Sequence, residues 1–307
     1  MPRHFLSVSS LGPSTLNYLA ERALEIARNG CEESLTGKTV GLYFRKSSTR
    51  TRTAFSVGAM KLGATIIAYG PADLQIFTGE SVQDTAKVLS GFLDGLVVRT
   101  NDAITEMENM AMQNRMAIIN AMADAEHPTQ AIADLTTIRE AFGRLFDLHI
   151  LYLGEGNNTT AALALAVAQV AGLRLTIVSP EGYGLGPAAL ERIASLARRY
   201  GGIVEQHHDI GHLSERVDVV YTTRWETMGV PKQDANWKRK FDPYRVTREL
   251  LAKVSKPGTI FLHDLPAMRG VEVDDDVLDG EQSLAFRQAR HKMTSAMAIL
   301  EWCLPGD

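Results

Sequence analysis

Short apolar runs alternate with longer amphipathic segments along the chain. The apolar runs have the length and composition of buried strands, and they cover residues 38–44, 64–70, 95–100, 116–120, 148–154, 173–179, 201–206, 217–222 and 259–264. Between them, apolar residues recur at helical spacing in residues 53–63, 81–93, 128–142, 160–172 and 188–200. This alternation predicts an α/β fold in which helices cover parallel sheets.

The length of 307 residues exceeds that of a typical domain and predicts two domains. The predicted helix 128–142 is followed by GRLFD, whose glycine would end it before a strand begins near Leu148. We expect two doubly wound parallel-sheet domains with a cleft between them, formed by residues 1–146 and 147–283. The last segment, residues 284–307, has the pattern of a long amphipathic helix and is expected to pack back on the first domain.

Composition narrows the class of partner. The hydrophobic fraction of 45%, the charged fraction of 22% and the formal charge of −4 are those of a globular protein without a field that attracts nucleic acid or anionic lipid. No apolar run is long enough to span a membrane, and the first residues lack the apolar core of a secretory signal. We therefore expect a cytoplasmic protein with neither a nucleic-acid nor a membrane partner.

Neither the cysteines nor the histidines suggest a metal site. Cys31 and Cys303 lie near opposite ends of the chain, so we expect both to be reduced. The cluster HHDIGH, residues 207–212, lacks the spacing of a zinc motif and is better explained as a solvated turn. We predict no metal.

In parallel α/β sheets, ligands bind beyond the carboxyl ends of the strands. The first such end is followed by the stretch FRKSSTRTRTAF, which would place Ser48, Thr49, Arg50 and Thr51 in the first turn of a helix. Free N–H groups at a helix start, hydroxyls and a guanidinium together bind phosphate. The alternative is an ordinary capped helix with solvated arginines, but two arginines alternating with threonines favour an anion site.

Two other glycine-containing stretches could suggest a nucleotide. GKT at residues 37–39 precedes a strand and lacks the earlier glycine of a phosphate loop, which excludes that motif. LGEGNNT at residues 153–159 follows a strand and opens a helix, but it lacks the third glycine of the dinucleotide fingerprint. Nicotinamide binding is therefore only a runner-up.

Further polar residues follow strands at the same predicted edge of the first sheet. Arg99 ends one strand, and His127 and Gln130 follow the next in EHPTQ. Alone, a histidine before proline is usually a capping or core residue, and an arginine after a strand is usually a surface charge. Together they favour a site for an anion and a polarised carbonyl group, because arginine and histidine donate to a developing oxyanion.

In the second half, the strand ends carry another polar set, which we expect to face the first domain. Its members are Asn157 and Asn158, Thr223 and Arg224, the TMG stretch at residues 227–229, and His263, Asp264 and Leu265. Asp264 could be a solvated carboxylate, but its place between a strand and Pro266 favours contact with substrate.

These residues carry a family resemblance. SSTRTR, Arg99, HPTQ and HDLP resemble, in order and spacing, the aspartate and ornithine carbamoyltransferases over nearly the whole chain. The ornithine branch is closer, since GEGNN resembles its GDGNN, TMG its SMG, and HDLPAMRGVEV its HCLPAHRGEEV. The resemblance implies two α/β domains, a homotrimer or a multiple of trimers with sites at subunit interfaces, carbamoyl phosphate and a small amine as substrates, and no cofactor.

The resemblance also implies residue roles. Carbamoyl phosphate would be bound by Ser48, Thr49, Arg50, Thr51, Arg99, His127, Gln130, Leu265 and Lys292. Within that set, Thr51, Arg99 and His127 would be catalytic and would stabilise the oxyanion. The acceptor would be bound by Asn158, Thr223, Arg224, Thr227, Met228 and Asp264.

The chain departs from the family pattern at the acceptor residues. Asp264 replaces a cysteine beside the reacting amine of ornithine enzymes, and Thr223 replaces the aspartate that grips the ornithine α-amino group. Arg224 resembles the arginine with which aspartate enzymes bind a carboxylate. At the phosphate site, Lys292 stands where ornithine enzymes have an arginine, and Thr78 where aspartate enzymes have a lysine supplied by a neighbouring subunit.

The leading hypothesis is transfer of a carbamoyl group to the amine of a small amino-acid-like acceptor, with release of phosphate. Asp264 would bind a cationic group of the acceptor that does not react, or would take a proton from the attacking amine; we favour binding. The alternatives are an authentic ornithine carbamoyltransferase that makes citrulline, and a catalytically silent protein that binds carbamoyl phosphate.

Overall fold

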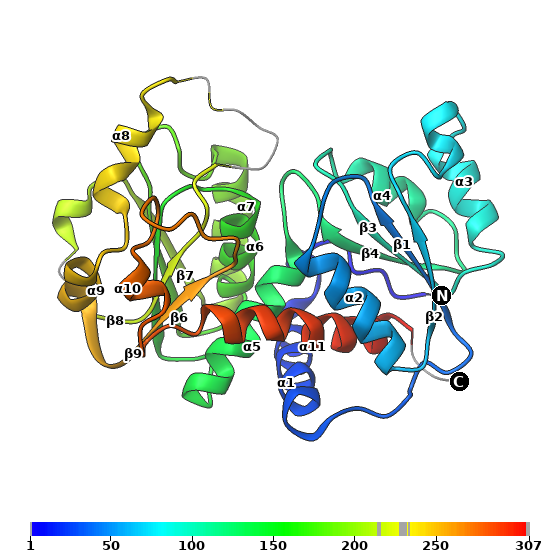
Figure 1. The fold of residues 1–307 in the computed structure, drawn as a ribbon, viewed down its shortest axis with the longest axis horizontal. Helices are drawn as coiled ribbons and strands as arrows, with labels where there is room; N and C mark the ends of the chain where they lie inside the picture. Colours follow the sequence, from blue (N-terminus) through cyan, green and yellow to red (C-terminus); the bar gives the residue numbers. More distant parts are fainter. Residues whose placement is uncertain (1, 214–215, 227–231, 233, 305–307) are drawn as a thin grey trace. The chain divides into compact units, whose positions relative to one another are not determined.

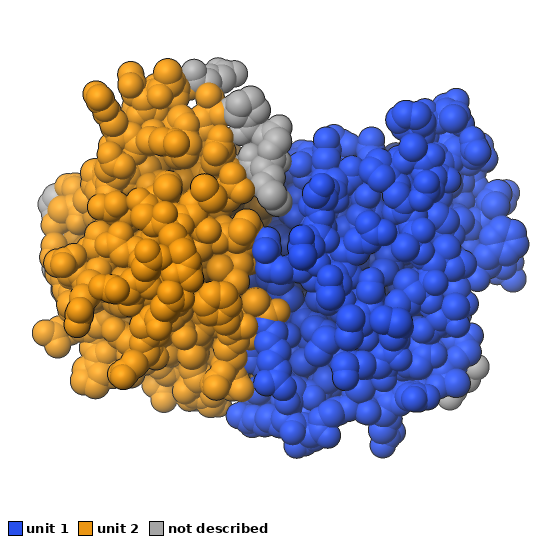
Figure 2. Space-filling view, viewed as in Figure 1, with its two compact units in different colours: residues 1–136, 290–307 blue, residues 137–289 orange. Residues whose placement is uncertain are grey.

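The computed structural model describes residues 2–213, 216–226, 232 and 234–304. It separates into two compact units, one formed by residues 1–136 and 290–307 and the other by residues 137–289 (Figure 2). We call these unit 1 and unit 2. These units divide the chain inside two helices, at points that differ from the domain limits inferred from the sequence. Those limits stay a prediction.

Unit 1 is built on a four-stranded parallel sheet with the order β2-β1-β3-β4 (Figure 1). The strands are β1 (Thr39–Phe44), β2 (Thr65–Tyr69), β3 (Gly95–Arg99) and β4 (Ala117–Met122). β3 and β4 are buried along their whole length, as expected for continuous apolar strands between helices, whereas the edge strand β2 is largely exposed. The outer edge of β4 is covered by Phe5, whose N–H donates to the Ile118 carbonyl at 2.9 Å.

Six helical segments belong to the described part of unit 1 apart from α5 and α11, which are described below. They are α1 (Gly12–Asn29), α2 (Arg50–Lys61), α3 (Val82–Leu89), α4 (Thr105–Met110) and the 3-10 turns η1 (Val8–Ser10) and η2 (Gln75–Thr78). Part of the core joins Tyr43, Leu96 and Ile118 of the strands to Met107 and Met110 of α4. Burial of such side chains is the main stabilising contribution to the unit.

Unit 2 contains a five-stranded parallel sheet with the order β7-β6-β5-β8-β9. The strands are β5 (Leu148–Leu153), β6 (Leu173–Val178), β7 (Ile203–His207), β8 (Val217–Thr222) and β9 (Ser255–His263). The helical segments are α6 (Asn158–Val167), α7 (Pro187–Tyr200), α8 (Trp237–Phe241), α9 (Arg248–Val254), α10 (Asp275–Leu278), η3 (Ile210–His212) and η4 (Asp242–Tyr244). The core on one face packs Trp225, Trp237 and Phe241 against Phe261. Helix α6 is buried from Thr159 to Val167, which explains its alanine-rich sequence.

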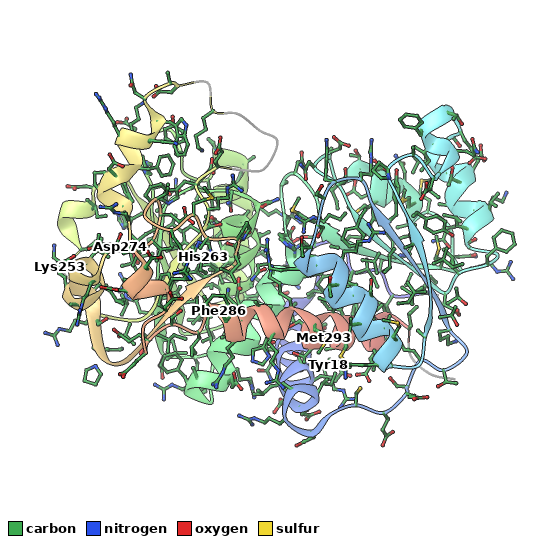
Figure 3. The ribbon with its side chains drawn as sticks, in the orientation of Figure 1. Tyr18, Lys253, His263, Asp274, Phe286 and Met293 are labelled. Carbon is green, nitrogen blue, oxygen red and sulfur yellow. The ribbon has the colours of Figure 1, made fainter. Side chains whose placement is uncertain are left out.

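Two helices contain the points at which the chain passes between units: α5 (Pro128–Phe142) and α11 (Ala285–Cys303). Most of α11 packs within unit 1, as predicted. Ser295 Oγ lies 3.4 Å from Thr136 Oγ1, and Glu301 accepts a hydrogen bond of 2.7 Å from Arg22 on α1. Figure 3 marks Met293 on α11 and Tyr18 on α1.

The predicted α/β class with two parallel sheets is confirmed, and every predicted strand is present. Helix α1 was not among the predicted helices. Cys31 and Cys303 are free, and burial raises the pKa of the Cys303 thiol, which keeps it protonated. Over the described part of the chain, no helix is long and apolar enough to cross a membrane, and no group of three or more His, Cys, Asp or Glu side chains is arranged to hold a metal ion.

Candidate active site

The predicted anion loop connects β1 to α2. Arg50 is the first helical residue, and the side chain of the preceding Thr49 does not cap the first turn. Thr51 is buried, and no hydrogen-bond partner for the buried Ser48 Oγ is found among the described residues. Hydroxyl and N–H donors therefore gather at the positive end of the α2 dipole, which suits an anion.

Arg99 lies beside this loop because β3 pairs with β1. It is the last residue of β3 and is in register with Phe44 on one side and Met122 on the other. Its side chain is 7% exposed, and Nη1 donates a hydrogen bond of 2.9 Å to Thr51 Oγ1. The contact joins two residues that the sequence places 48 positions apart. A buried guanidinium at this point adds a positive charge to the anion loop.

Arg45, at the start of the same loop, has different partners. Its guanidinium lies 2.9 Å from the Asp102 carboxylate and 2.6 Å from that of Glu106. These two carboxylates offset the positive charge of Arg45. Arg50, by contrast, begins α2, and Arg99 ends β3 beside the loop.

His127 lies between β4 and α5 and is 6% exposed. Burial is the largest cause that lowers its pKa well below 6.5, and the positive charges of Lys292 and Arg99 lower it further. The imidazole is therefore neutral near pH 7 and donates through one ring N–H. Its Nδ1 lies 3.3 Å from Thr129 Oγ1, and the tautomer of the imidazole decides which of these two atoms donates.

The remaining unit 1 residues complete this set. Gln130 lies in the first turn of α5, is 1% exposed and donates from Nε2 to Asp134 Oδ1 at 2.7 Å. Lys292 is on α11, and its charge acts on His127. Glu126 anchors the segment before His127 by accepting hydrogen bonds from Ser7 Oγ at 2.6 Å and from the Val8 N–H at 2.7 Å.

In unit 2, Asp264 is held by two hydroxyl groups. Thr223 Oγ1 donates to Asp264 Oδ1 at 2.9 Å, and Thr159 Oγ1 donates to Oδ2 at 3.0 Å. Thr223 follows β8, Thr159 lies in the first turn of α6, and Asp264 follows β9. The Asp264 carboxylate therefore connects three segments of the chain. Burial, and next the negative charge of Asp264, raise the pKa of the nearby Tyr152 hydroxyl. Each Asp264 oxygen still has a lone pair for a further donor.

Hydrogen bonds of the His263 side chain hold the turn that carries Asp264. Figure 3 labels His263 at the end of β9. His263 Nδ1 accepts a hydrogen bond of 2.8 Å from the Leu265 N–H, and Nε2 lies 3.2 Å from Glu272 Oε1. This leaves Nε2–H to donate to the buried Glu272. Leu265 has a φ of 54°, a left-handed conformation that is unfavourable for leucine and that this hydrogen bond holds in place.

The glycines of LGEGNNT have a packing reason. A Cβ on Gly154 would lie 2.5 Å from Trp225 Nε1, and a Cβ on Gly156 would overlap the backbone of Gly184 and Leu185. A buried side chain beside Gly154 and backbone beside Gly156 therefore explain both glycines without a dinucleotide. Asn157 then caps α6 by accepting from the N–H groups of Thr159 and Thr160, and its Nδ2 lies 3.5 Å from Thr223 Oγ1.

Glu155 of the same loop forms an ion pair with Lys232, whose ammonium lies 4.9 to 5.2 Å from the ring centres of Tyr183, Trp237 and Phe241. Burial raises the pKa of the Glu155 carboxyl, and Lys232 opposes that shift. Glu155 therefore stabilises the loop through its ion pair with Lys232, and cation–π contacts hold Lys232 in place.

Asn158 and Arg224 are further predicted acceptor residues in the described part of the chain. Asn158 is the first residue of α6, and Arg224 follows β8, with its guanidinium 3.8 Å from the Glu226 carboxylate. Leu265, predicted to bind carbamoyl phosphate, belongs to unit 2. Thr227 and Met228 lie outside the described residues.

Some residues of the two sites were missed by sequence reasoning. Asp134 could have been found from its spacing, since it lies one helical turn after Gln130. Thr159 as a partner of Asp264 had no such signal, because 105 positions separate the two.

Comparison with known proteins gives matches over both halves of the chain. Residues 3–140 match the family described as aspartate/ornithine carbamoyltransferase, carbamoyl-P binding domain. Residues 147–303 match aspartate/ornithine carbamoyltransferase, Asp/Orn binding domain.

Individual relatives agree with the family matches. The ornithine carbamoyltransferase of Oceanobacillus iheyensis is 38% identical over 97% of this chain and 93% of its own length. That of Caldicellulosiruptor saccharolyticus is 39% identical over 99% of both chains. Among solved structures, ornithine carbamoyltransferase from Pyrococcus furiosus has a TM-score of 0.92 and 32% identity, covering 100% of this chain and 98% of its own.

Gly156→Ala tests the packing explanation of the glycines. The added methyl group meets backbone, which cannot move aside. We therefore expect the free energy of unfolding to fall by about 1–3 kcal/mol. Gly186→Ala is the control, because nothing lies within 4 Å of its Cβ position. Gly186 is the N-cap of α7, and alanine is a weaker N-cap, so this variant should lose at most about 1 kcal/mol of unfolding free energy. Denaturant titration measures both, and equal losses would contradict the explanation.

His127→Gln tests the buried neutral imidazole. Because the pKa of His127 is lowered in the folded protein, the unfolded chain binds the extra proton first as the pH falls through 6.5. The wild type should therefore lose stability relative to the variant by up to about 1.4 kcal/mol per pH unit below about pH 6.5, until the folded pKa is reached. Denaturant titrations between about pH 7.5 and about pH 5 measure this. Parallel curves for the two proteins would show that the pKa of His127 is not lowered.

Proposed function

The chain belongs to the aspartate/ornithine carbamoyltransferase family, and we propose that its acceptor is a small amino-acid-like amine whose non-reacting cationic group binds Asp264. The chain is a carbamoyltransferase and transfers a carbamoyl group to an amine. The acceptor class and the role of each residue are the content of the proposal. The observation that carries it is the Asp264 carboxylate held by Thr159 and Thr223.

In the proposed donor site, the phosphate of carbamoyl phosphate binds to the start of α2. Ser48, Thr49 and Thr51 supply hydroxyls, Arg50 supplies a charged fork, and Lys292 adds a point charge. Leu265 is assigned to the same substrate on the family resemblance alone. Support for this assignment comes from the uncapped first turn of α2 and from the contact between Arg99 and Thr51.

The carbamoyl carbonyl group is assigned to three donors: Arg99, Thr51 and the neutral His127. A neutral imidazole N–H is well suited here, because it stabilises an oxyanion by hydrogen bonding without giving up its proton. The lowered pKa of His127 supports this role.

The transfer itself follows from these placements. The neutral amine nitrogen attacks the carbonyl carbon, a carbon–nitrogen bond forms and the carbonyl π electrons move onto oxygen. As the double bond re-forms, the bond from carbon to the phosphate oxygen breaks and phosphate leaves with that electron pair. The phosphate grows more basic as it departs and accepts the proton that the nitrogen loses. The products are a ureido compound and phosphate.

Asp264 fits binding better than proton transfer. A carboxylate beside the attacking amine would raise the pKa of that amine and keep it protonated, which slows attack. A carboxylate beside a second, non-reacting ammonium group stabilises the complex without this cost. Arg224 would bind a carboxylate of the acceptor, while Asn158, Thr223, Thr227 and Met228 complete the acceptor site.

Ornithine remains an alternative acceptor, since the relatives above carry that name and ornithine has both a reacting amine and a second ammonium group. The chain differs at Thr223 and Asp264, where the carboxylate has changed position, and this favours another acceptor. The catalytically silent alternative is not favoured, because the family is one of enzymes. A homotrimer or multiple of trimers is a further part of the proposal and rests on the family resemblance. A cytoplasmic location is proposed as well, on the sequence pattern described above.

A panel of amines tests the acceptor class. Purified protein receives carbamoyl phosphate with diamino acids of increasing length, with the matching diamines and with monoamino acids, and phosphate release is measured. We expect turnover only with acceptors that carry a second cationic group, and faster turnover when a carboxylate is also present. Robust turnover of ornithine above all others would show that Thr223 and Asp264 do not change specificity. Binding of carbamoyl phosphate without release for any amine would support the silent alternative.

Asp264→Asn distinguishes the two roles of Asp264. If the carboxylate binds an ammonium group, the KM for the preferred acceptor should rise about 10- to 100-fold, the range expected for a lost charged hydrogen bond, with little change in the KM for carbamoyl phosphate. Asp279→Asn is the control, because this exposed carboxylate pairs with Arg269. An unchanged KM, with a lower kcat and a shifted pH–rate profile, would instead assign proton transfer to Asp264.

A further inference from the structure

Three carboxylates lie in the loops that form the proposed acceptor site of unit 2. They belong to Glu155 after β5, Glu226 after β8 and Asp264 after β9. Burial is the largest cause that raises the pKa of the Tyr152 hydroxyl, and the charges of Asp264 and Glu155 raise it further. Two of the carboxylates therefore lie within electrostatic reach of one hydroxyl group. Their own partners decide how many cationic groups an acceptor finds a place for.

Two of the three carboxylates are paired with a cation of the chain itself. The Glu226 carboxylate lies 3.8 Å from the Arg224 guanidinium. Glu155 forms an ion pair with Lys232, and the two side chains are only 17% and 8% exposed. Asp264 accepts from two threonine hydroxyls, and in the part of the chain that the structure describes no lysine or arginine pairs with it.

His263 does not supply the missing charge to Asp264. Its Nδ1 lies 3.6 Å from Asp264 Oδ1. That nitrogen accepts a hydrogen bond of 2.8 Å from the Leu265 N–H, so it carries no proton and the imidazole is neutral. Of the three carboxylates, Asp264 is therefore the one whose charge remains for a ligand.

Lys232 is held at the place where it neutralises Glu155. Its ammonium lies 4.9 Å from the ring centre of Tyr183, 5.2 Å from that of Trp237 and 5.1 Å from that of Phe241. The rings also pack on one another, with 4.9 Å between the centres of Tyr183 and Phe241 and 5.6 Å between those of Trp237 and Phe241. Three aromatic faces stabilise a desolvated cation, so this ammonium is a fixed charge.

One oxygen of Glu155 is still without a hydrogen bond. Oε1 accepts from Lys232, whereas Oε2 is buried and receives no hydrogen bond from any residue that the structure describes. Unsatisfied buried acceptors are uncommon in folded proteins. Loss of the Lys232 charge would therefore add a second unpaired carboxylate to that of Asp264, with an oxygen that has no donor of its own.

We infer that Lys232 is a specificity-determining residue for the acceptor. By neutralising Glu155, it leaves Asp264 as the single one of the three carboxylates that binds a cation, so the acceptor that fits carries one non-reacting cationic group. A second such group finds no charge partner at Glu155 and is repelled by the Lys232 ammonium. This inference rests on the proposed function, because it assumes that a cationic group of the acceptor binds Asp264.

Two amines of equal length test how many cations the site accepts. Spermidine has a terminal amine, a distal ammonium group and a central secondary amine. In the matching diamine, a methylene group replaces that central nitrogen. Isothermal titration calorimetry with saturating phosphonoacetamide, a stable analogue of carbamoyl phosphate that transfers no carbamoyl group, gives the ratio of their dissociation constants. The wild type should bind spermidine no more tightly than the diamine.

Lys232→Met removes the ammonium and keeps an unbranched side chain that packs among aromatic rings. Glu155 then offers a second carboxylate, so spermidine should bind about 10- to 100-fold more tightly than the diamine, the range of a charged hydrogen bond. This preference should grow as the pH rises. Without Lys232, burial and the charge of Glu226 both raise the pKa of Glu155, so its carboxyl group becomes charged only at higher pH.

Glu155→Gln is the opposite change, because it leaves the Lys232 ammonium without its carboxylate. This variant should bind spermidine more weakly relative to the diamine than the wild type does, and it decides the question even where Lys232→Met does not fold. The double variant removes both charges and should lose the preference of Lys232→Met for spermidine. A loop that had merely loosened would weaken both amines alike in every variant.

Lys240→Met is the matched control. Lys240 lies 5.7 Å from the ring centre of the same Tyr183, but it is half exposed and pairs with Asp234 at 2.8 Å. Its removal does not change the charge at Glu155, so the ratio of the two dissociation constants should equal that of wild type.

The inference would be overturned by a wild type that prefers spermidine, by a Lys232→Met variant that does not, or by a ratio in Glu155→Gln equal to that of wild type. Each of these results leaves the proposed function intact, since carbamoyl transfer to an acceptor with one non-reacting cation does not depend on Lys232. Failure of the wild type to release phosphate with any acceptor that has a second cationic group would overturn the proposed function instead.

Discussion

The parallel direction of the strands is the constraint on which both candidate sites depend. Because neighbouring strands run the same way, the residues that follow them lie along one edge of each sheet. Pairing of β1 with β3 brings Arg99 next to the anion loop, and pairing of β8 with β9 brings Thr223 next to Asp264. Most side chains of each site are thus supplied by strand ends and by the segments that follow them, while the sheets fix the distances among those segments.

Much of the fold was predictable from the sequence, since buried strands and amphipathic helices leave distinct patterns. Helix α5 has the bounds predicted for it, and β5 to β9 follow the apolar runs closely. Helix α1 carries the same signals, with a proline in its first turn and leucines at helical spacing, yet it was not among the predicted helices. The points at which the two units divide could not be read from the pattern, because they fall inside the continuous helices α5 and α11.

The sequence predicts at which sheet edge each candidate site lies, but it does not predict most of the contacts among the side chains of the site. The anion loop and Arg99 could be assigned to one edge, whereas the hydrogen bond from Arg99 to Thr51 depends on strand register and rotamers. The pair formed by Gln130 and Asp134 is local and could be read from helical spacing. The support of Asp264 by Thr159 joins the first turn of α6 to the segment after β9, and no periodicity within either segment encodes it.

The short distance between Thr223 and Asp264 has an evolutionary consequence. With 2.9 Å between their oxygens, a carboxylate could change from one strand end to the other and keep its charge in nearly the same place. An ancestor with aspartate at both positions would have held two carboxylates that share one proton, and an ancestor with neither would have lost its cation site. The first route keeps a negative charge at every step. Neighbouring strand ends of a parallel sheet can therefore exchange a charged side chain without any change in their total charge.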